Sequence, residues 1–460
     1  MRRALAAALL TVGLLAPRAV ADCVPRTSAD GLRVLPGPAL RMGLTPAGEA
    51  GALGPAVPLT PIDPEKTYAA LAQLRPPGDA PFVLRLNRLF WSDGEAGLAR
   101  FAAAAAAYTA RGYDVELQVR YHPPAGHDGD VDGFVGFVRE VVRRFGPNPR
   151  VVGLQIANEV NFTISPDSSD GAYKNARLAL VRGVIAAHDE AARLGYGQLT
   201  VGFNWFYRTD PRSEDAFWNG LWTDGGEAFV RAVDWVGLDV YPGTVFPPVE
   251  PPGGERDGMV AALDDLRVCE MPLAHLGTAV PIHVEENGWP TGPGRSEADQ
   301  AEALREMVGA VEEFHGTYGV TDYRWFDLRD HNSSSQNFQH HYGLLRDDYS
   351  AKPAFALYRA LVAAWSLRPP AARLALHLAR GARCAARLSV VGADAGSVRR
   401  VVGRLALRAS RRRTLRVAVL AALADGRVVS VVRRVRPCTR PTRRRSRRGA
   451  AAGAPRPAGA

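Results

Sequence analysis

The stretch VVGLQIANE, residues 151–159, combines a short apolar run with an acidic end. Its length and composition are typical of a strand that is buried on both faces of a parallel sheet. Because the run ends on Glu159, such a strand carries a carboxylate at its carboxyl end. The stretch PIHVEE, residues 281–286, has the same form and ends on Glu285 and Glu286.

Similar apolar runs recur on both sides of these two stretches. The eight expected strands are residues 40–44, 82–87, 115–121, 151–157, 199–204, 233–240, 281–286 and 322–326. Amphipathic helical patterns lie between them, for example at residues 98–110, 131–145, 172–194 and 297–314. Eight strand-helix repeats predict a (β/α)8 TIM barrel, an α/β fold. A doubly wound open sheet is the alternative, but no glycine-rich phosphate loop supports it.

A second, smaller unit is expected after the barrel. A last helix at residues 353–365 closes the barrel, and the prolines at 369 and 370 begin a linker. Five short segments with alternating polarity follow, at residues 374–378, 386–391, 401–407, 414–420 and 428–435. They predict a small immunoglobulin-like β-sandwich over residues 369–438, after a barrel domain over residues 22–368. Residues 439–460 are mostly Arg, Pro, Gly and Ala, so we expect a disordered basic tail.

The first 21 residues have the pattern of a secretory signal peptide. Two arginines precede an apolar centre at residues 4–16, and Ala19-Val20-Ala21 resembles a cleavage site. The apolar centre is too short to span a bilayer. We therefore expect a secreted or cell-envelope-associated protein with no membrane span.

The four cysteines fit an exported protein with disulfide bonds. Cys384 and Cys438 bracket the expected sandwich, so we expect them to pair there. Cys23 and Cys269 would then form the remaining pair. No Cys/His cluster has metal-ligand spacing, and the sequence implies neither a metal nor a cofactor.

Charge is distributed unevenly along the chain. Residues 371–460 contain 23 arginines and two acidic residues, a net charge of +21, whereas the whole chain carries +10. The preceding 370 residues therefore carry −11. No motif for stacking or groove reading accompanies the arginines, so nucleic acid is an unlikely partner for an exported protein. An anionic cell-envelope polymer is a better candidate, with a solvated arginine-rich surface as the alternative.

The carboxylates of strands four and seven have the chemistry of glycoside hydrolysis. In a (β/α)8 barrel, catalytic groups sit at the carboxyl ends of the strands, where these glutamates lie. One carboxylic acid protonates the leaving oxygen, while a second carboxylate attacks the anomeric carbon or activates a water.

At this point the chain resembles the clan A (β/α)8 glycoside hydrolases, which are retaining enzymes. The pair Asn158-Glu159 matches the Asn-Glu after strand four of that clan, whose Glu is the acid/base. The stretch ENGWPT, residues 286–291, is similar to the nucleophile motif of plant-type β-1,3-glucanases, and the family 5 cellulase-like enzymes share the layout. The motif favours Glu286 as the nucleophile, whereas strict strand alternation places Glu285 inside the barrel. Both assignments stay open at this point.

Five further residues are candidates for substrate binding. The resemblance implies that Arg85 keeps the nucleophile ionised, since an adjacent cation lowers a carboxylate's pKa. It also implies that Tyr241 contacts the nucleophile and that Asn158 holds the sugar hydroxyl next to the anomeric carbon. His122 follows strand three and could bind a sugar hydroxyl or orient the acid/base. Trp325 ends strand eight, where many clan members stack a sugar on a tryptophan.

These features predict a secreted retaining glycoside hydrolase that cleaves a β-linked polysaccharide or oligosaccharide. Glu159 is the expected acid/base and Glu286 the expected nucleophile. The alternative is a non-catalytic carbohydrate-binding barrel that the basic C-terminal domain anchors to the cell envelope. The presence of both carboxylates favours the enzyme.

Overall fold

The computed structural model describes residues 23–46, 58–76, 78, 80–164, 166–209, 211–249 and 254–366, together with the backbone of five strands between residues 373 and 435. The chain divides into two units, with the boundary between Arg368 and Pro369. The expected signal peptide and basic tail lie outside the described residues.

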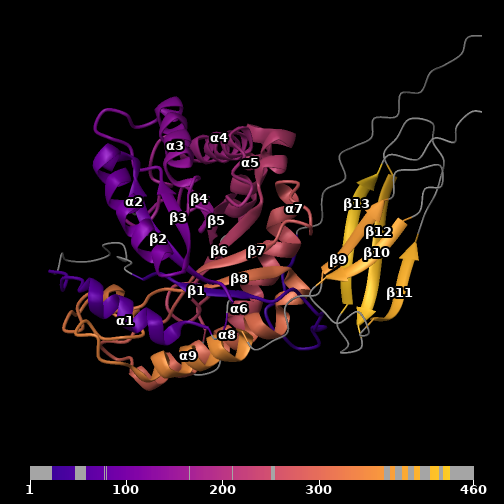
Figure 1. The fold of residues 1–460 in the computed structure, drawn as a ribbon. Helices are drawn as coiled ribbons and strands as arrows, with labels where there is room; N and C mark the ends of the chain where they lie inside the picture. The colour runs from indigo at the N-terminus through magenta and orange to yellow at the C-terminus, as the bar shows by residue number, and fades with distance from the viewer. Residues whose placement is uncertain are drawn as a thin grey trace, which may run out of the picture. The chain divides into compact units, whose positions relative to one another are not determined.

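The first unit is a closed barrel of eight parallel strands (Figure 1). The strands are β1 (Arg41–Leu44), β2 (Phe82–Phe90), β3 (Asp114–Arg120), β4 (Val151–Ile156), β5 (Thr200–Phe206), β6 (Trp235–Val240), β7 (Ile282–Asn287) and β8 (Val320–Trp325). Each strand pairs with the next along the chain, and β8 closes the ring against β1. The predicted (β/α)8 barrel is confirmed, and every expected strand overlaps an observed one.

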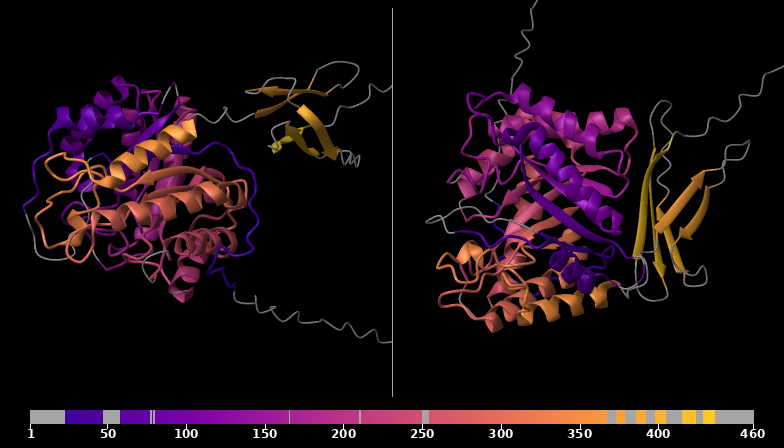
Figure 2. Two further views of the ribbon diagram at one scale, coloured as in Figure 1. Left: turned by 90° about the horizontal axis from the view of Figure 1, so that it is seen from below. Right: turned by 60° about the vertical axis from the view of Figure 1, so that its left-hand side comes forward.

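Helices follow each strand and surround the barrel, as two further views show (Figure 2). They are α1 (Pro64–Leu74), α2 (Gly94–Ala110), α3 (Val131–Phe145), α4 (Ala176–Leu194), α5 (Pro211–Ala232), α6 (Glu255–Asp264), α7 (Met271–Leu273), α8 (Glu297–Tyr318) and α9 (Pro353–Ser366). A π-helical turn, Asp265–Glu270, joins α6 to α7. Within the described part of the chain, no helix is both long and apolar enough to cross a bilayer.

Local sequence signals explain where several helices begin. Asp63 caps α1 by accepting hydrogen bonds from two backbone N–H groups, and Pro64 occupies the first turn. Ser296 and Asp299 form a reciprocal capping box at the start of α8. These side chains satisfy backbone N–H groups that have no partner inside the helix.

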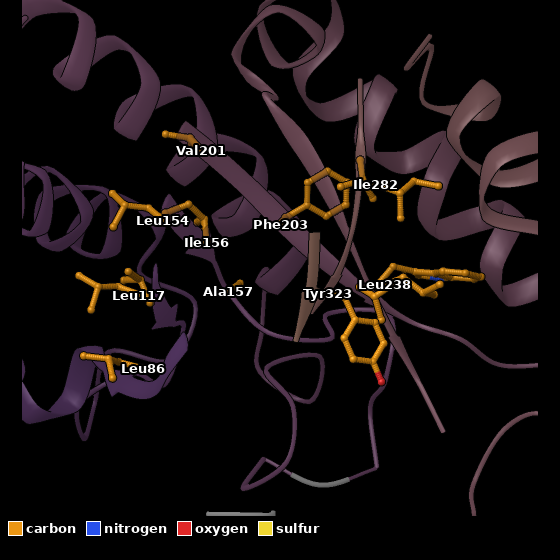
Figure 3. Packing of buried hydrophobic residues seen from close by; sticks show 14 of the residues in the cluster. Leu86, Leu117, Leu154, Ile156, Ala157, Val201, Phe203, Leu238, Ile282 and Tyr323 are labelled. Atoms are coloured by element: carbon orange, nitrogen blue, oxygen red, sulfur yellow. The ribbon is translucent and has the colours of Figure 1, made fainter. Parts of the chain in front are cut away.

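Alternation along the strands separates an apolar outer layer from a polar barrel interior. Side chains such as Leu154, Phe203 and Leu238 belong to the hydrophobic core (Figure 3). The neighbouring positions carry polar groups that are equally buried. They are Arg85, Glu116, Gln118, Gln155, Asn204, Asp239, His283, Glu285, Asp322 and Arg324. Buried polar groups must bond to one another, so this interior is a hydrogen-bonded network beneath the barrel mouth.

One disulfide joins the start of the described chain to the helical layer. Cys23 and Cys269 are bonded, with their Cα atoms 5.6 Å apart and a sequence separation of 246. This pairing confirms the expectation for these two cysteines. The expected Cys384–Cys438 pair lies outside the described residues.

Within the described residues, the second unit has five strands in two antiparallel sheets. β9 (Arg373–Leu378) pairs with β10 (Ala386–Val391), and β12 (Leu415–Leu423) lies between β11 (Val398–Arg404) and β13 (Val428–Val435). Each of the five expected strands overlaps an observed one. The packing of the two sheets into a sandwich stays a prediction.

Candidate active site

Glu159 follows β4, where the backbone leaves the strand in an unusual conformation. Ala157 and Glu159 have φ values of 61° and 45°, a region that residues other than glycine rarely adopt. The backbone N–H of Glu159 donates to Oδ1 of Asn204 in β5 at 2.8 Å, which ties this turn to the next strand. Strained backbone of this kind concentrates at functional sites.

Glu159 and Glu286 line one pocket, and Glu286 reaches it from β7 because that strand is bulged at its carboxyl end. The register between β6 and β7 shifts between Leu238 and Asp239 of β6, and the register between β7 and β8 shifts between Val284 and Asn287 of β7. Glu285 therefore stays fully buried in the barrel interior, while Glu286 also reaches the inner side and lines the pocket. Strict alternation accounts for Glu285 but not for Glu286, because a bulge resets the two-residue period.

Two donors hold the Glu286 carboxylate. Arg85 Nη1 lies 2.7 Å from Glu286 Oε1, and the Tyr241 hydroxyl donates to Oε2 at 2.7 Å. Arg85 is itself fully buried. Burial alone would lower the pKa of Arg85, but the charges of Glu286 and neighbouring carboxylates raise it above its usual value, so the guanidinium stays charged.

A glutamine connects this pair to Asn158. Nε and Nη2 of Arg85 both donate to Gln155 Oε1, at 3.1 and 2.7 Å. Gln155 Nε2 in turn donates to Asn158 Oδ1 at 3.1 Å. Gln118 and Asn204 donate to the same Asn158 oxygen, at 2.7 and 2.8 Å. Side chains from three strands, β3, β4 and β5, thus fix the orientation of the Asn158 amide.

Three carboxyl groups meet at the base of the pocket. An oxygen of Glu159, one of Asp239 and one of Glu286 all lie within 4.8 Å of each other. Burial and the charge of Glu286 raise the pKa of Glu159 well above its usual range. The same two causes raise the pKa of Asp239. Glu159 therefore keeps its proton to a higher pH than a solvated glutamate would.

The pocket above these groups is lined by polar and by aromatic side chains. The polar lining residues are Asn87, Arg88, Gln118, Arg120, Asn158, Asp167, Ser168 and Gln339. The aromatic lining residues pack on one another as a separate cluster, which we call the aromatic wall: Phe162, Phe206, Tyr241, Phe326 and Tyr342.

Two candidate residues lie away from this pocket. Trp325 is fully buried and its ring centroid is 6.5 Å from that of Tyr358 in α9, so the next residue, Phe326, provides the aromatic surface. Alternation explains this placement, because Arg324 and Phe326 face inward and Trp325 faces the helices. His122 is half-buried; its Nδ1 is 3.0 Å from Ser92 Oγ, and its ring packs near Phe90.

The structure brings together five of the candidate residues, Arg85, Asn158, Glu159, Tyr241 and Glu286. Asp239, Asn204 and the two interior glutamines, Gln118 and Gln155, also belong to the site and were not among the candidates from the sequence. The sequence spacing could have identified Asp239. It stands two residues before Tyr241, so alternation places both side chains on the same face of the chain.

Two acidic clusters have the geometry of a cation site, but arginines accompany both. One cluster contains Glu159, Asp239 and Glu286, and the other contains Glu116, His283 and Glu285. Arg85 contacts Glu286 in the first, and Arg324 Nη2 lies 3.6 Å from Glu116 in the second. A cation bound at either place would lie beside a guanidinium. These groups are therefore better suited to sharing protons and hydrogen bonds than to binding a metal.

Comparison with known proteins gives structural likeness only. No protein-family model matches the chain, and no curated protein sequence matches it. Among solved structures, the fold resembles a glycoside hydrolase family 17 β-1,3-glucanosyltransferase from Rhizomucor miehei. The two are 17% identical, with 69% of this chain and 97% of that chain covered and a TM-score of 0.43.

Two further structures show a similar degree of likeness. A GH5_18 protein from Streptomyces cattleya is 18% identical over 73% of this chain and 82% of its own, with a TM-score of 0.48. A family 39 glycoside hydrolase from Bacteroides cellulosilyticus is 15% identical over 86% and 79%, with a TM-score of 0.47. These likenesses concern the barrel fold alone.

Proposed function

We propose that this protein is a retaining glycoside hydrolase in which Glu159 is the acid/base and Glu286 is the nucleophile. The observation that carries the proposal is the short distance between the two carboxyl groups. One oxygen of Glu159 lies within 4.8 Å of one oxygen of Glu286, so the two groups are close enough for the retaining geometry. Retaining enzymes place the carboxyl groups about 5–5.5 Å apart, while inverting enzymes leave about 6.5–9.5 Å for a water.

The surroundings of the two glutamates differ in the way that their roles require. Glu286 accepts hydrogen bonds from Arg85 and Tyr241 on its two oxygens, which orient it as a carboxylate nucleophile. Burial raises the pKa of Glu159, so its proton is available to a leaving group. Two carboxyl groups with contrasting environments are typical of a nucleophile and acid/base pair.

The reaction then has two steps. Glu286 attacks the anomeric carbon while Glu159 gives its proton to the glycosidic oxygen, and the leaving sugar departs. A water then loses a proton to Glu159 and attacks the anomeric carbon, which breaks the bond to Glu286. The second hydrogen on Asn158 Nδ2 is suited to the sugar hydroxyl beside the anomeric carbon, since the first bonds to the backbone carbonyl of Ser168 at 2.8 Å.

The substrate proposed is a β-linked polysaccharide or oligosaccharide. The aromatic wall supports this choice, because the C–H face of a sugar packs on aromatic rings. The polar lining residues supply amide and guanidinium donors for hydroxyl groups. In this proposal the wall takes the stacking role expected of Trp325, and a binding role for His122 requires a substrate that extends beyond the pocket.

We also propose that the protein is exported and that its C-terminal region attaches it to the cell envelope. The disulfide between Cys23 and Cys269 supports an oxidising compartment. The +21 charge of residues 371–460 supports contact with an anionic envelope polymer. Deletion of residues 369–460 should release the barrel from the cell envelope if this contact exists.

The proposed activity is tested by the release of reducing sugars from β-glucans, mannan, xylan and galactan. We expect hydrolysis of at least one polymer by the wild type, and its loss in both Glu159→Gln and Glu286→Gln. These substitutions keep the size of each side chain and remove its acid chemistry. Binding of a polymer without hydrolysis would instead favour the carbohydrate-binding barrel.

A further inference from the structure

The mechanism above gives no role to Asp239, the third carboxyl group of the cluster. Asp239 lies in β6, is fully buried, and stands behind the pocket surface rather than on it. One of its oxygens is within 4.8 Å of both Glu159 and Glu286. A group this close to both proposed catalytic carboxylates affects the charge on each of them.

The hydrogen bonds of Asp239 are incomplete if the group is ionised. Its Oδ2 accepts a hydrogen bond from Asn204 Nδ2, the same residue whose Oδ1 accepts the backbone N–H of Glu159. Its Oδ1 has no hydrogen-bond donor, although it is buried. Leaving a buried carboxylate oxygen without a donor costs several kcal/mol, so a proton on Oδ1 is the simpler state.

The charges around Asp239 also favour its protonated state. Arg85 gives its hydrogen bonds to Glu286 and Gln155, and Arg120 Nε lies 2.8 Å from Asp170. A negative charge on Asp239 would therefore face that of Glu286 without a direct cationic partner. Burial and the Glu286 charge both raise the pKa of the Asp239 carboxyl.

A proton on Asp239 also has an acceptor. An oxygen of Glu159 lies within 4.8 Å of an oxygen of Asp239, so the Glu159 carboxyl group is the acceptor that we assign to this proton. Two carboxylates cannot hydrogen-bond to each other, because both would only accept. A hydrogen bond between the two groups therefore requires a proton on one of them, and Asp239 has the buried oxygen without a donor.

We propose that Asp239 is a neutral carboxylic acid that donates a hydrogen bond to Glu159 throughout the reaction, as a positioning residue for the acid/base. This inference rests on the proposed function for its catalytic meaning. In the first step the Glu159 O–H bond breaks, its proton goes to the leaving oxygen, and Glu286 becomes a neutral ester. The new negative charge on Glu159 is then stabilised by the Asp239 O–H. In the second step Glu159 regains a proton from water, and the charge returns to Glu286.

The kinetic test compares Asp239→Asn with Asp239→Leu. An asparagine amide can replace the O–H donor, so we expect kcat/KM within about threefold of the wild type. Leucine has similar size and no donor, and a hydrogen bond to a charged group contributes about 1.5–3 kcal/mol, or roughly a 10- to 100-fold loss of kcat. Without the donor the pKa of Glu159 should also rise, which moves the basic limb of the pH profile upward. A role in packing alone would not move that limb.

An inactive but folded Asp239→Asn variant, with an unfolding temperature like that of the wild type, would overturn the inference. That result would mean that an ionised or proton-transferring Asp239 is needed. The comparison variants are Glu159→Gln and Glu286→Gln, for which the same change of acid to amide should abolish activity.

An infrared difference spectrum tests the protonation without using activity. At neutral pH, the wild type minus Asp239→Asn should show the carbonyl stretching band of a protonated carboxyl group. Carboxylate bands alone would overturn the inference. If the wild type hydrolyses no glycoside, the proposed function fails, while this band still reports on Asp239 independently.

Discussion

Glu159 combines a strained backbone with a carboxyl group that is hard to ionise. Its positive φ and its contact with Asn204 fix where the carboxyl group sits, and burial together with the Glu286 charge raises its pKa. A group with a raised pKa stays protonated as pH increases past the ordinary glutamate value of about 4.3. The chemistry of this residue therefore depends on the folded site rather than on its sequence position.

This leads to a prediction for the pH dependence of hydrolysis. kcat/KM for a substrate with a poor leaving group should fall on the basic side, with an apparent pKa well above that of a solvated glutamate, because Glu159 must be protonated. The measurement is the pH profile of the wild type on an aryl glycoside with a poor leaving group, compared with that of Glu159→Ala on an aryl glycoside whose leaving group needs no protonation.

In Glu159→Ala the basic limb should disappear, and azide should restore part of the rate by attacking the glycosyl-enzyme. A basic limb that is unchanged in this variant would assign the titration to another group. Tyr241→Phe is a matched control, since it removes a contact to Glu286 and leaves the acid/base in place.

Arg85 and Tyr241 were candidates because of the resemblance to a known clan rather than because of strand alternation, and both contact Glu286. Trp325 was expected in the pocket, but its side chain faces the helices. Arg324, the residue before it, faces the barrel interior, so alternation turns Trp325 outward. Asn204 could not be recognised from sequence, since an amide at a strand end has many uses and its three partners come from other strands.

At the scale of elements, the bulge in β7 determines which glutamate reaches the pocket. Glu285 lies in the barrel interior, where Oε1 is 3.2 Å from His283 Nδ1 and Oε2 is 3.5 Å from Arg85 Nε. Glu286 is the next residue and lines the pocket. Alternation cannot predict this pair, because the extra residue of a bulge depends on the neighbouring strands.

The bulge predicts different consequences for two adjacent substitutions. Glu286→Gln should lower kcat by more than about a thousandfold, since it removes the nucleophile. Glu285→Gln keeps the pocket surface and should lower kcat by only about tenfold, through a weaker hold on Arg85. The measurement is kcat on one substrate with both variants, alongside their unfolding temperatures.

Equal losses of kcat in two equally stable variants would contradict this assignment of the two glutamates.

The strands and helices themselves were largely predictable from the sequence, because apolar strands and amphipathic helices have distinct periods. The residues at which the strands and helices begin and end were less predictable. For example, α4 begins at Ala176, after a turn in which Asn175 adopts a left-handed conformation.

At the scale of the whole molecule, the segment that precedes β1 is tied to the outer helices. Cys23 bonds to Cys269 in the π-helical turn, and two backbone N–H groups add to this attachment. Arg26 N donates to Asp264 at 2.8 Å, and Ala29 N donates to Asp257 at 2.9 Å. The disulfide closes a loop of 246 residues, so it strongly restricts the unfolded chain.

Removal of this disulfide should therefore lower stability without changing the chemistry. Cys23→Ser is the better variant, because Cys23 is exposed and Cys269 is buried. We expect the free energy of unfolding to fall by about 2–5 kcal/mol, with kcat unchanged at a temperature where the variant is folded. Thermal unfolding with and without a reducing agent measures the effect. An unfolding temperature equal to that of the wild type would contradict it.

The central claim is that Glu286 forms a covalent glycosyl-enzyme. The most direct measurement uses glycosyl fluorides in which fluorine replaces the hydroxyl beside the anomeric carbon, so that the intermediate forms faster than water releases it. Mass spectrometry of the intact protein and of its peptides should find one sugar on Glu286, and none in Glu286→Gln. A sugar on Glu285 or Asp239, or a hydrolysis product with inverted anomeric configuration, would contradict the account.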